Sequence, residues 1–237
     1  MTSRPDQRQI VIRTGEPVAL AHWLCEELFF ETVDEQTVYN EDCSLLLLAG
    51  NTTAPRAPAP GTYYTGLAHV ALAAADIDSA LAHCKARGLP LQTATGGGSF
   101  YNPGVFGGGE RYFNILTPFG FVLEVAQRVC GPLQKGPAPI AGLDHIGVPC
   151  PDFAAELQAL AARGFQPLFA PVQNYNEAEG HIACCMVADA ALTLEVYQFL
   201  DFAPRPMPHH TPLRGIAPYP QTQTPGGLYF MPKGEAE

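Results

Sequence analysis

The sequence predicts an α+β fold in which βαβββ modules follow one another along the chain. A pattern of strand, helix and three strands occurs twice between residues 66 and 200, and a weaker copy precedes residue 60. The two strong copies also carry the same helix boundaries, an aspartate before the first turn and a glycine just after the last. Because the strand–helix pattern and the helix-capping residues recur together in both copies, the repeat indicates supersecondary units of the same kind.

Residues 1–60 form the weak copy. RQIVIRT reads as a strand, EPVALAHWLCEELFFE as a helix with proline in its first turn, and CSLLLLAGN as a strand before a proline-rich linker. Aligning ALAHW of this copy with ALAHC of the next sets the register between the two copies, that is, which residues occupy equivalent positions. In that register Arg8, Ile10 and Ile12 stand near the position of a later histidine, and Leu47 replaces a later glutamate. We therefore expect a degenerate module without metal ligands.

Residues 66–130 form the second module. A strand is expected at Leu67–Leu72, and a helix begins after Asp76 and ends before Gly88. A glycine-rich stretch, TGGGSFYNPGVFGGGE, follows. The apolar runs RYFNIL and FGFVLEVAQ then predict two strands, which the turn sequence TPFG separates.

Residues 140–200 repeat this order as a third module. Its helix begins after Asp152 and ends before Gly164, and HIACCMVAD and AALTLEVYQFL predict the late strands. The linker GPLQKGPAP separates it from the second module. Residues 201–237 are rich in proline and lack a clear period, so we expect an extended C-terminal tail packed along a surface rather than a fourth module.

Composition and charge limit the partners and the compartment that we expect for this chain. The 237 residues include 13 basic and 23 acidic side chains, and a net charge of −10 disfavours nucleic acid and membrane surfaces as partners. No apolar run reaches the length of a spanning helix, and the first residues do not resemble a signal peptide. Seven cysteines without a CxxC spacing favour a reducing compartment, so we expect a cytoplasmic protein with a small-molecule substrate.

Each strong module has one histidine on its first strand and one glutamate on its last. Glu124 follows His69 by 55 residues, and Glu195 follows His145 by 50. A strand directs alternate side chains to one face, so residues at matching positions of paired modules can meet. An ionised carboxylate within an apolar strand is costly unless it is paired or binds a metal.

Two imidazoles and two carboxylates suit a divalent cation. Zinc, nickel, cobalt, manganese and ferrous iron all accept such ligands, so the identity of the metal stays open. The alternative interpretation is that each histidine is a satisfied core residue and each glutamate a salt-bridged strand residue. Repetition of the pair at the same module position favours the metal site.

The segments HVALAAADIDSAL with GFVLEVAQ, and DHIGVPCPDFAAEL with LTLEVYQ, resemble the vicinal oxygen chelate superfamily. That superfamily includes glyoxalase I, methylmalonyl-CoA epimerase and extradiol dioxygenases. The resemblance implies that two modules pair into a cupped mixed sheet, as in glyoxalase, with a divalent metal held in the cup. Carried over by position, the ligands would be His69, Glu124, His145 and Glu195.

The resemblance also implies a reaction. Two carboxylates favour a lyase, isomerase or epimerase that removes a proton next to a metal-bound carbonyl of a small oxygenated substrate. Glu195, slightly preferred, or Glu124 would be the catalytic base. One alternative is an iron(II) extradiol-type dioxygenase, which resembles a site of two histidines and one carboxylate. Another is a metal-free protein that binds an antibiotic in the cup.

Several other side chains are candidate substrate contacts. The glycine-rich stretch is expected to form a flap over the site, and the strands of module three should border the cup. A solvated loop is the competing interpretation for the module-three residues. The candidates are Tyr101, Phe106, Arg111, Tyr112, Asn174, Tyr175 and His181.

The odd number of modules leaves the pairing open. If module one pairs with module two, module three needs a partner from another subunit, and two copies of it would also supply two histidines and two glutamates. The metal site is then shared between subunits. We expect a homodimer.

Overall fold

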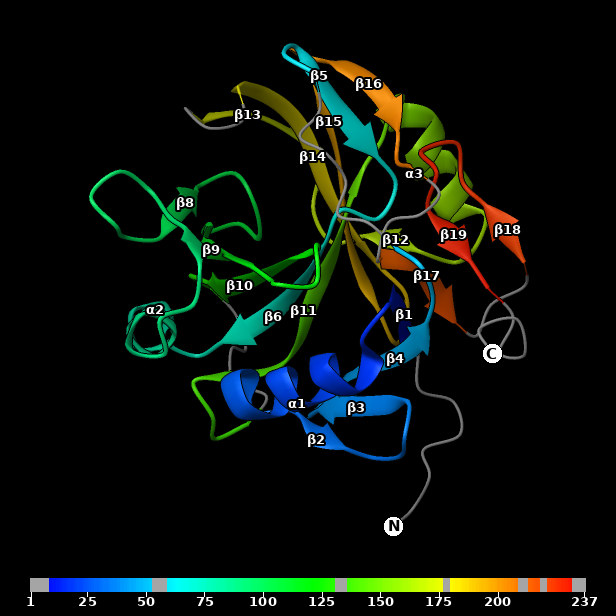
Figure 1. Cartoon of the computed structure of the whole chain (residues 1–237). Coiled ribbons are helices and arrows are strands. Elements are labelled where there is room, and N and C mark those ends of the chain that lie inside the picture. Colours follow the sequence, from blue (N-terminus) through cyan, green and yellow to red (C-terminus); the bar gives the residue numbers. More distant parts are fainter. Residues whose placement is uncertain are drawn as a thin grey trace.

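The computed structural model describes residues 9–52, 59–130, 136–176, 180–208, 213–217 and 221–231. Within these ranges the chain has three helices and two large mixed sheets, which confirms the predicted α+β class (Figure 1). Arg8, most of the linker before module two and part of the linker between modules two and three fall outside the described ranges.

The first module has the strand, helix and three strands that its sequence predicts. Helix α1 begins with proline at its first position, where a missing N–H is tolerated, and ends at Phe29 in the left-handed conformation. β1 and β4 are parallel neighbours, and β3 and β2 follow outward. The elements are β1 (Gln9–Thr14), α1 (Pro17–Leu28), β2 (Glu31–Thr32), β3 (Thr37–Asn40) and β4 (Cys43–Ala49).

The C-terminal tail completes the sheet of module one. β17 (Leu213–Ala217) pairs antiparallel with β1, and β19 (Tyr229–Phe230) and β18 (Thr222–Gln223) extend the sheet further. In its described residues the tail thus adds strands to this sheet. The reason is that β1 would otherwise present an unpaired edge, and Ile216 and Phe230 would leave the core.

Modules two and three follow the same order of elements. Asp76 and Asp152 are the N-cap residues of their helices, accepting hydrogen bonds from the backbone N–H groups of Asp78 and Ala155. Module two has β6 (His69–Ala74), α2 (Ile77–Ala86), β7 (Leu91–Gln92), β8 (Phe100–Asn102), β9 (Glu110–Leu116) and β10 (Val122–Arg128). Module three has β11 (Ile140–Pro149), α3 (Phe153–Ala161), β12 (Gln166–Pro167), β13 (Val172–Asn176), β14 (Gly180–Ala188) and β15 (Thr193–Phe199). β5 (Thr62–Thr65), before module two, pairs with β16 (Ala203–Pro206) of the tail in a separate two-stranded sheet.

These two modules share a ten-stranded sheet within one chain. Its centre has the order β15-β11-β6-β10, and β6 and β11, the first strands of the two modules, are antiparallel neighbours. Each last strand, β10 or β15, lies parallel to the first strand of its own module. Module two therefore pairs with module three, and the four predicted ligands lie on four adjacent strands.

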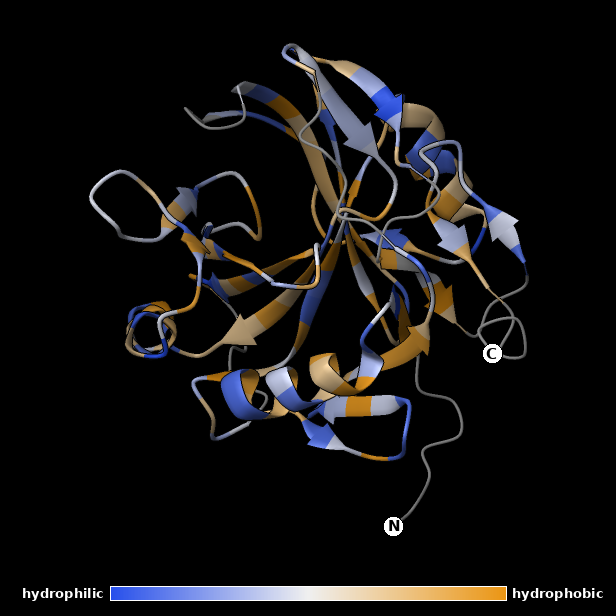
Figure 2. Ribbon diagram, in the orientation of Figure 1, coloured by the Kyte–Doolittle hydropathy of each residue, from blue (hydrophilic) through white to orange (hydrophobic). Residues whose placement is uncertain are grey.

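Apolar residues from both sheets and all three described helices form the main core. β11 is buried along all of its ten residues, since it lies in the middle of the sheet. Apolar side chains also dominate β4 and β17, as Figure 2 shows. A second, smaller cluster lies on the opposite face of the module-one sheet around Val11, Leu46 and Leu48.

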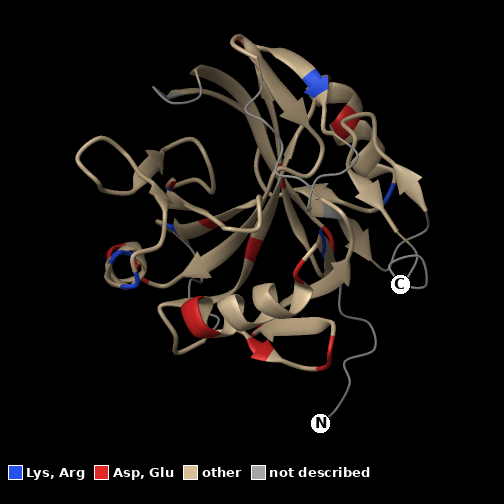
Figure 3. Ribbon diagram, in the orientation of Figure 1, with Lys and Arg blue, Asp and Glu red and all other residues tan. Residues whose placement is uncertain are grey.

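Charge is unevenly distributed over the fold. α1 and β2 carry acidic residues without basic ones, as the red segments of Figure 3 show. Arg13 is the only lysine or arginine in residues 9–52.

None of the helices in the described ranges is long and apolar enough to cross a membrane.

The tail is also tied to helix α3 by a buried carboxyl group. Glu156 is fully buried, and its Oε2 accepts a 2.6 Å hydrogen bond from the backbone N–H of Gly226. Its Oε1 has no hydrogen-bond partner among the residues that the structure describes. Burial raises the pKa of Glu156 above its ordinary value. In the folded protein this carboxyl group therefore resists ionisation.

We expect Glu156→Gln to raise the unfolding temperature at pH 7 and to leave it nearly unchanged at pH 4. A raised pKa in the folded state costs stability as pH rises above the unfolded-state value, because only the unfolded chain ionises freely. Glutamine keeps the acceptor for Gly226 without that cost. Thermal unfolding at both pH values, with the exposed Glu35→Gln as control, measures the effect. A lower unfolding temperature for Glu156→Gln at pH 7 would contradict the argument.

Candidate metal centre

The four predicted ligands converge at the centre of the ten-stranded sheet. His69 lies on β6, Glu124 on β10, His145 on β11 and Glu195 on β15. The Nε2 atoms of the two histidines are 3.4 Å apart. The nearest carboxylate oxygens of Glu195 and Glu124 lie 3.6 and 4.0 Å from Nε2 of His69. Those of Glu124 and Glu195 lie 3.3 and 3.7 Å from Nε2 of His145.

Strand register explains this convergence. His69 is opposite Gly147 on the neighbouring strand, and His145 is opposite Ala71. Glu195 is the other neighbour of Gly147, and Glu124 is the other neighbour of Ala71. Each of these two small residues thus lies between the histidine of the other module and the glutamate of its own module.

The space above Gly147 is filled by the ring of His69. A Cβ atom built on Gly147 would overlap that ring, and its nearest atom would be Cε1 of His69. Contacts this close do not occur between non-bonded carbon atoms. The absence of a side chain at Gly147 therefore allows the imidazole to lie over the centre of the sheet.

His69 has the protonation state that a metal ligand needs. Burial lowers the pKa of His69 to about 4, the carboxylate of Glu124 opposes the shift, and the His145 ring adds to it. The imidazole is therefore neutral at pH 7. A neutral nitrogen has a free lone pair for a cation.

His145 lies in a more negative environment. Burial alone would lower the pKa of His145, but the carboxylates of Asp144, Glu110 and Glu124 outweigh it and hold that pKa well above its ordinary value. Oδ1 of Asp144 is 3.0 Å from Nδ1 of His145, and Arg128 forms an ion pair with Asp144 at 3.0 Å. Asp144 thereby fixes the ring orientation and leaves Nε2 directed at the centre.

Glu110 is a further buried carboxyl group beside the centre. It is 2% exposed, and its Oε1 lies 3.9 Å from Nδ1 of His145 and has no hydrogen-bond partner in the described segments. Burial raises the pKa of Glu110 well above its ordinary value, and neighbouring carboxylates add to the shift. The carboxyl group is therefore disposed to remain protonated in the absence of a cation.

The centre opens into a small cavity of about 200 Å³. Among the described residues that line it there is no lysine or arginine, so it offers no fixed cation for a phosphate or carboxylate. Its polar groups are amides, phenols, three of the four predicted ligands and the carboxyl group of Glu110. The lining residues are Ala68, His69, Gln92, Asn102, Glu110, Tyr112, Asn114, Val122, Glu124, Ile182, Glu195 and Tyr197.

One of the seven predicted substrate contacts, Tyr112, lines this cavity. Its neighbour on β9, Arg111, points to the other face and forms an ion pair with Asp78 at 2.7 Å. Tyr175 is opposite His181 across β13 and β14, and both side chains are largely exposed. The structure does not bring these three residues to the cavity.

Of the remaining predicted contacts, Tyr101 and Phe106 belong to the glycine-rich stretch, and Asn174 lies on β13 of module three. Tyr101 is 54% exposed, and Phe106 packs beneath the guanidinium group of Arg128, 3.9 Å from its ring centroid. Asn174 donates a 2.9 Å hydrogen bond to Asn102, which does line the cavity. The loop that we expected as a flap thus packs against module three. Its contacts are structural in this conformation.

Sequence reasoning missed several residues of the centre. Asp144, directly before His145, has no counterpart before His69, so the repeat did not identify it. Glu110 follows a run of glycines outside any motif. Ala71 and Gly147 were detectable, since a small residue stands two positions after each histidine.

Comparison with known proteins identifies the fold. No family model matches the sequence, and no curated protein matches it. A point mutant of glyoxalase I from Zea mays matches with a TM-score of 0.60 and 14% sequence identity over 94% of this chain and 89% of that chain. Another mutant and a further structure of the same enzyme give TM-scores of 0.52 and 0.51, at 15% and 14% identity over 94% and 93% of this chain and 73% and 70% of those chains.

The class of protein defined by these observations is one with the glyoxalase fold and a cluster of side chains that could hold a metal ion. The glyoxalase-like fold that the sequence resemblance implied is confirmed. At 14 to 15% identity the likeness to the maize enzyme is one of fold.

The donor set fits a divalent cation. Atoms that share one ion at about 2.1 Å lie about 3.0–3.4 Å from one another, slightly closer than the distances in this cluster. His69 is neutral, and the carboxylates that raise the pKa of His145 create a negative potential that attracts a cation as well as a proton. Ligand atoms of His69, His145 and Glu195 all lie within 4.8 Å of one another.

Proposed function

We propose that this protein is a divalent-metal-dependent lyase or isomerase that removes a proton next to a carbonyl group of a small oxygenated substrate. The observation that carries the proposal is the convergence of two imidazoles and two carboxylates in a largely buried cup. The metal ligands are His69, His145, Glu124 and Glu195. A divalent cation bound there, one of zinc, nickel, cobalt, manganese or iron, polarises the carbonyl group and increases the acidity of the adjacent C–H bond.

The residues around the cavity have separable roles in this proposal. Glu195 accepts the substrate proton, with Glu124 as the alternative base, because both carboxylates line the cavity. Gln92, Asn102 and Asn114 offer amide groups to hydroxyl and carbonyl oxygens. A volume of about 200 Å³ without a fixed cation favours a small, uncharged α-hydroxycarbonyl compound.

Exchange of hydrogen for deuterium tests the proton-transfer step without knowledge of the product. Metal-loaded protein in D₂O is incubated with dihydroxyacetone or glyceraldehyde, and deuterium at the carbon next to the carbonyl is followed by NMR. We expect Glu195→Gln to slow exchange by about 10²-fold or more, since a positioned base contributes about 10²–10⁴-fold. Glu124→Gln tests the alternative base. Protein with Glu35→Gln, a substitution at an exposed position, should catalyse substrate exchange at the wild-type rate.

A second candidate function is ring cleavage by an iron(II) dioxygenase. His69, His145 and Glu195 alone form a set of two histidines and one carboxylate, which is the ligand set of such enzymes. An assay without oxygen separates the two candidates. Deuterium exchange that continues at the same rate under argon supports proton transfer, whereas consumption of oxygen with a catechol, absent under argon, supports the dioxygenase.

The homodimer also stays a prediction, although one chain brings all four ligand residues together.

A further inference from the structure

A second cavity lies on the opposite face of the module-one sheet from helix α1 and shares no described lining residue with the metal cup. Its volume is about 390 Å³, nearly twice that of the cup and within the range of small-molecule sites. Three separate segments form it: β1, the stretch before β6, and the C-terminal tail. The lining residues are Arg13, Thr65, Gly66, Leu67, Pro206, Met207, Pro208, Leu213, Gln223, Gly227, Tyr229 and Met231.

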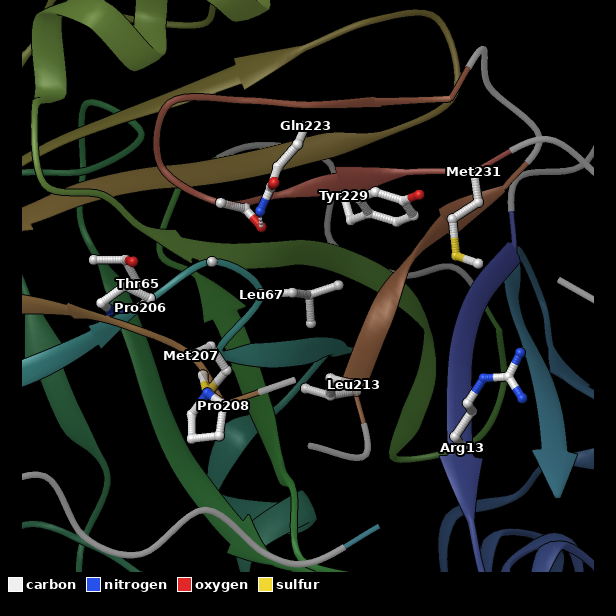
Figure 4. A pocket seen from close by; sticks show the side chains of 12 residues that line it. Arg13, Thr65, Leu67, Pro206, Met207, Pro208, Leu213, Gln223, Tyr229 and Met231 are labelled. Atoms are coloured by element: carbon white, nitrogen blue, oxygen red, sulfur yellow. Dashed lines mark hydrogen bonds between the residues drawn. The ribbon is translucent and has the colours of Figure 1, made fainter. Parts of the chain in front are cut away.

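The walls of this cavity differ in chemistry from one end to the other. Figure 4 shows Arg13 at one end, Leu67 and Leu213 in the middle, and Gln223 toward the opposite side. The apolar middle continues into the small cluster around Val11, Leu46 and Leu48 on the same face of the sheet. A ligand that fits must therefore have an apolar body and a polar or charged end.

Arg13 is held in place by its strand. β1 is paired on both sides, with β4 and β17, and Arg13 is opposite Leu48 on β4. Val11, two residues earlier, has its side chain on the same face, as the alternation of a strand requires. The stem of Arg13 packs on Gly50, where an added Cβ atom would lie 3.5 Å from Cδ of the arginine.

The guanidinium group of Arg13 lacks a carboxylate partner among the described residues. Within the described part of the chain its one hydrogen bond joins Nη1 to the carbonyl oxygen of Ala49 at a long distance of 3.4 Å. A guanidinium group has five N–H donors in a planar fork that matches a carboxylate. Among the described lining residues Arg13 is also the only lysine or arginine, so a ligand with one negative charge complements them.

From these observations we infer that the cavity is a second binding site, for a small amphipathic carboxylate. The carboxylate forms a bidentate ion pair with Arg13, and the apolar body contacts Leu67, Leu213 and Met231. Gln223 donates its Nε2–H to the carbonyl oxygen of Gly227, and the Tyr229 hydroxyl oxygen accepts from Gln221, so Oε1 of Gln223 and the hydroxyl hydrogen of Tyr229 are the atoms offered to a polar group further along the ligand. This site is independent of the metal cup and of the reaction proposed for it.

Binding of 4-phenylbutanoate tests the inference, with 4-phenylbutan-1-ol as the uncharged matched ligand. Titrations followed by ligand-observed NMR should show the carboxylate binding to the wild-type protein and the alcohol binding at least about tenfold more weakly. Arg13→Gln should weaken the carboxylate by about tenfold and leave the alcohol unchanged. Arg205→Gln removes an exposed charge from nearby β16 and should change neither.

Two further variants separate this site from the metal cup and from loss of structure. Met207→Glu places a negative charge in the apolar wall and should weaken the carboxylate more than the alcohol, with an unfolding temperature close to wild type because Met207 is only partly buried. His145→Ala, which removes a proposed metal ligand, should bind the carboxylate as the wild type does. Equal affinity of Arg13→Gln and wild type for 4-phenylbutanoate would overturn the inference, and so would loss of binding in His145→Ala.

Discussion

Replacing His145 by alanine is expected to reduce bound metal from about one ion per chain to less than about a tenth. The change removes one of the two nitrogen ligands and also separates Asp144 from the centre, because the ring of His145 is what joins them. Loss of a residue that only orients a ligand costs about 10–100-fold in metal affinity, so loss of the ligand itself should cost at least as much. Metal content is measured by plasma mass spectrometry after growth with each candidate metal and extensive dialysis.

His181→Ala is the matched control for this experiment. His181 lies on β14 of the same module, but its side chain is exposed and pairs with Asp201 at 2.9 Å. Its loss should leave the metal content unchanged. His69→Ala should lower it as His145→Ala does if both modules supply one site. Full occupancy in His145→Ala would refute the proposed centre, and a wild-type protein that takes up none of the metals would favour a metal-free binding protein.

Adding a single methyl group at Gly147 is expected to lower metal affinity by about 10- to 100-fold while the fold is kept. In Gly147→Ala the new Cβ would overlap the ring of His69, so the imidazole must leave its position over the centre. The overlapping atoms belong to a side chain that can rotate, and the backbone of β11 does not need to move. We expect displacement of His69 to lower metal affinity by the same factor as removal of a residue that orients a metal ligand.

Gly98→Ala serves as the control, since a Cβ atom there meets nothing within 4 Å. Metal affinity from competition with a chelator should match the wild type for Gly98→Ala and fall for Gly147→Ala. Thermal unfolding without metal checks that both variants fold. Unchanged affinity in Gly147→Ala would mean that His69 does not bind the metal, even if His145 does.

The second cavity has consequences for the degenerate module. Module one lacks ligands at the positions of the later histidines and glutamates, yet its sheet is completed by the tail and forms one wall of the larger cavity. Arg13, near the end of β1, supplies the charge there. In the inferred site, module one therefore supplies a binding residue although it has no residues at the metal-ligand positions.

The sequence by itself determined the modules and the four ligand candidates. Helix caps at Asp76 and Asp152, strand alternation and the matching His–Glu pairs are short-range or repeated features, and the structure has them in the expected elements. Their physical causes act within a few residues, through backbone hydrogen bonds at helix ends and the alternation of side chains along a strand. For this reason they could be predicted without knowledge of the rest of the chain.

Only the tertiary structure decided which modules pair and which side chains face the cavity. β6 joins β11 and the tail joins β1 because each exposed edge finds a partner far away in the sequence, and no local pattern encodes that choice. Asp144 and Glu110 become part of the centre only when β9, β10, β6 and β11 form one sheet around His145. Their roles depend on burial and on charges brought together by folding, which a linear pattern does not contain.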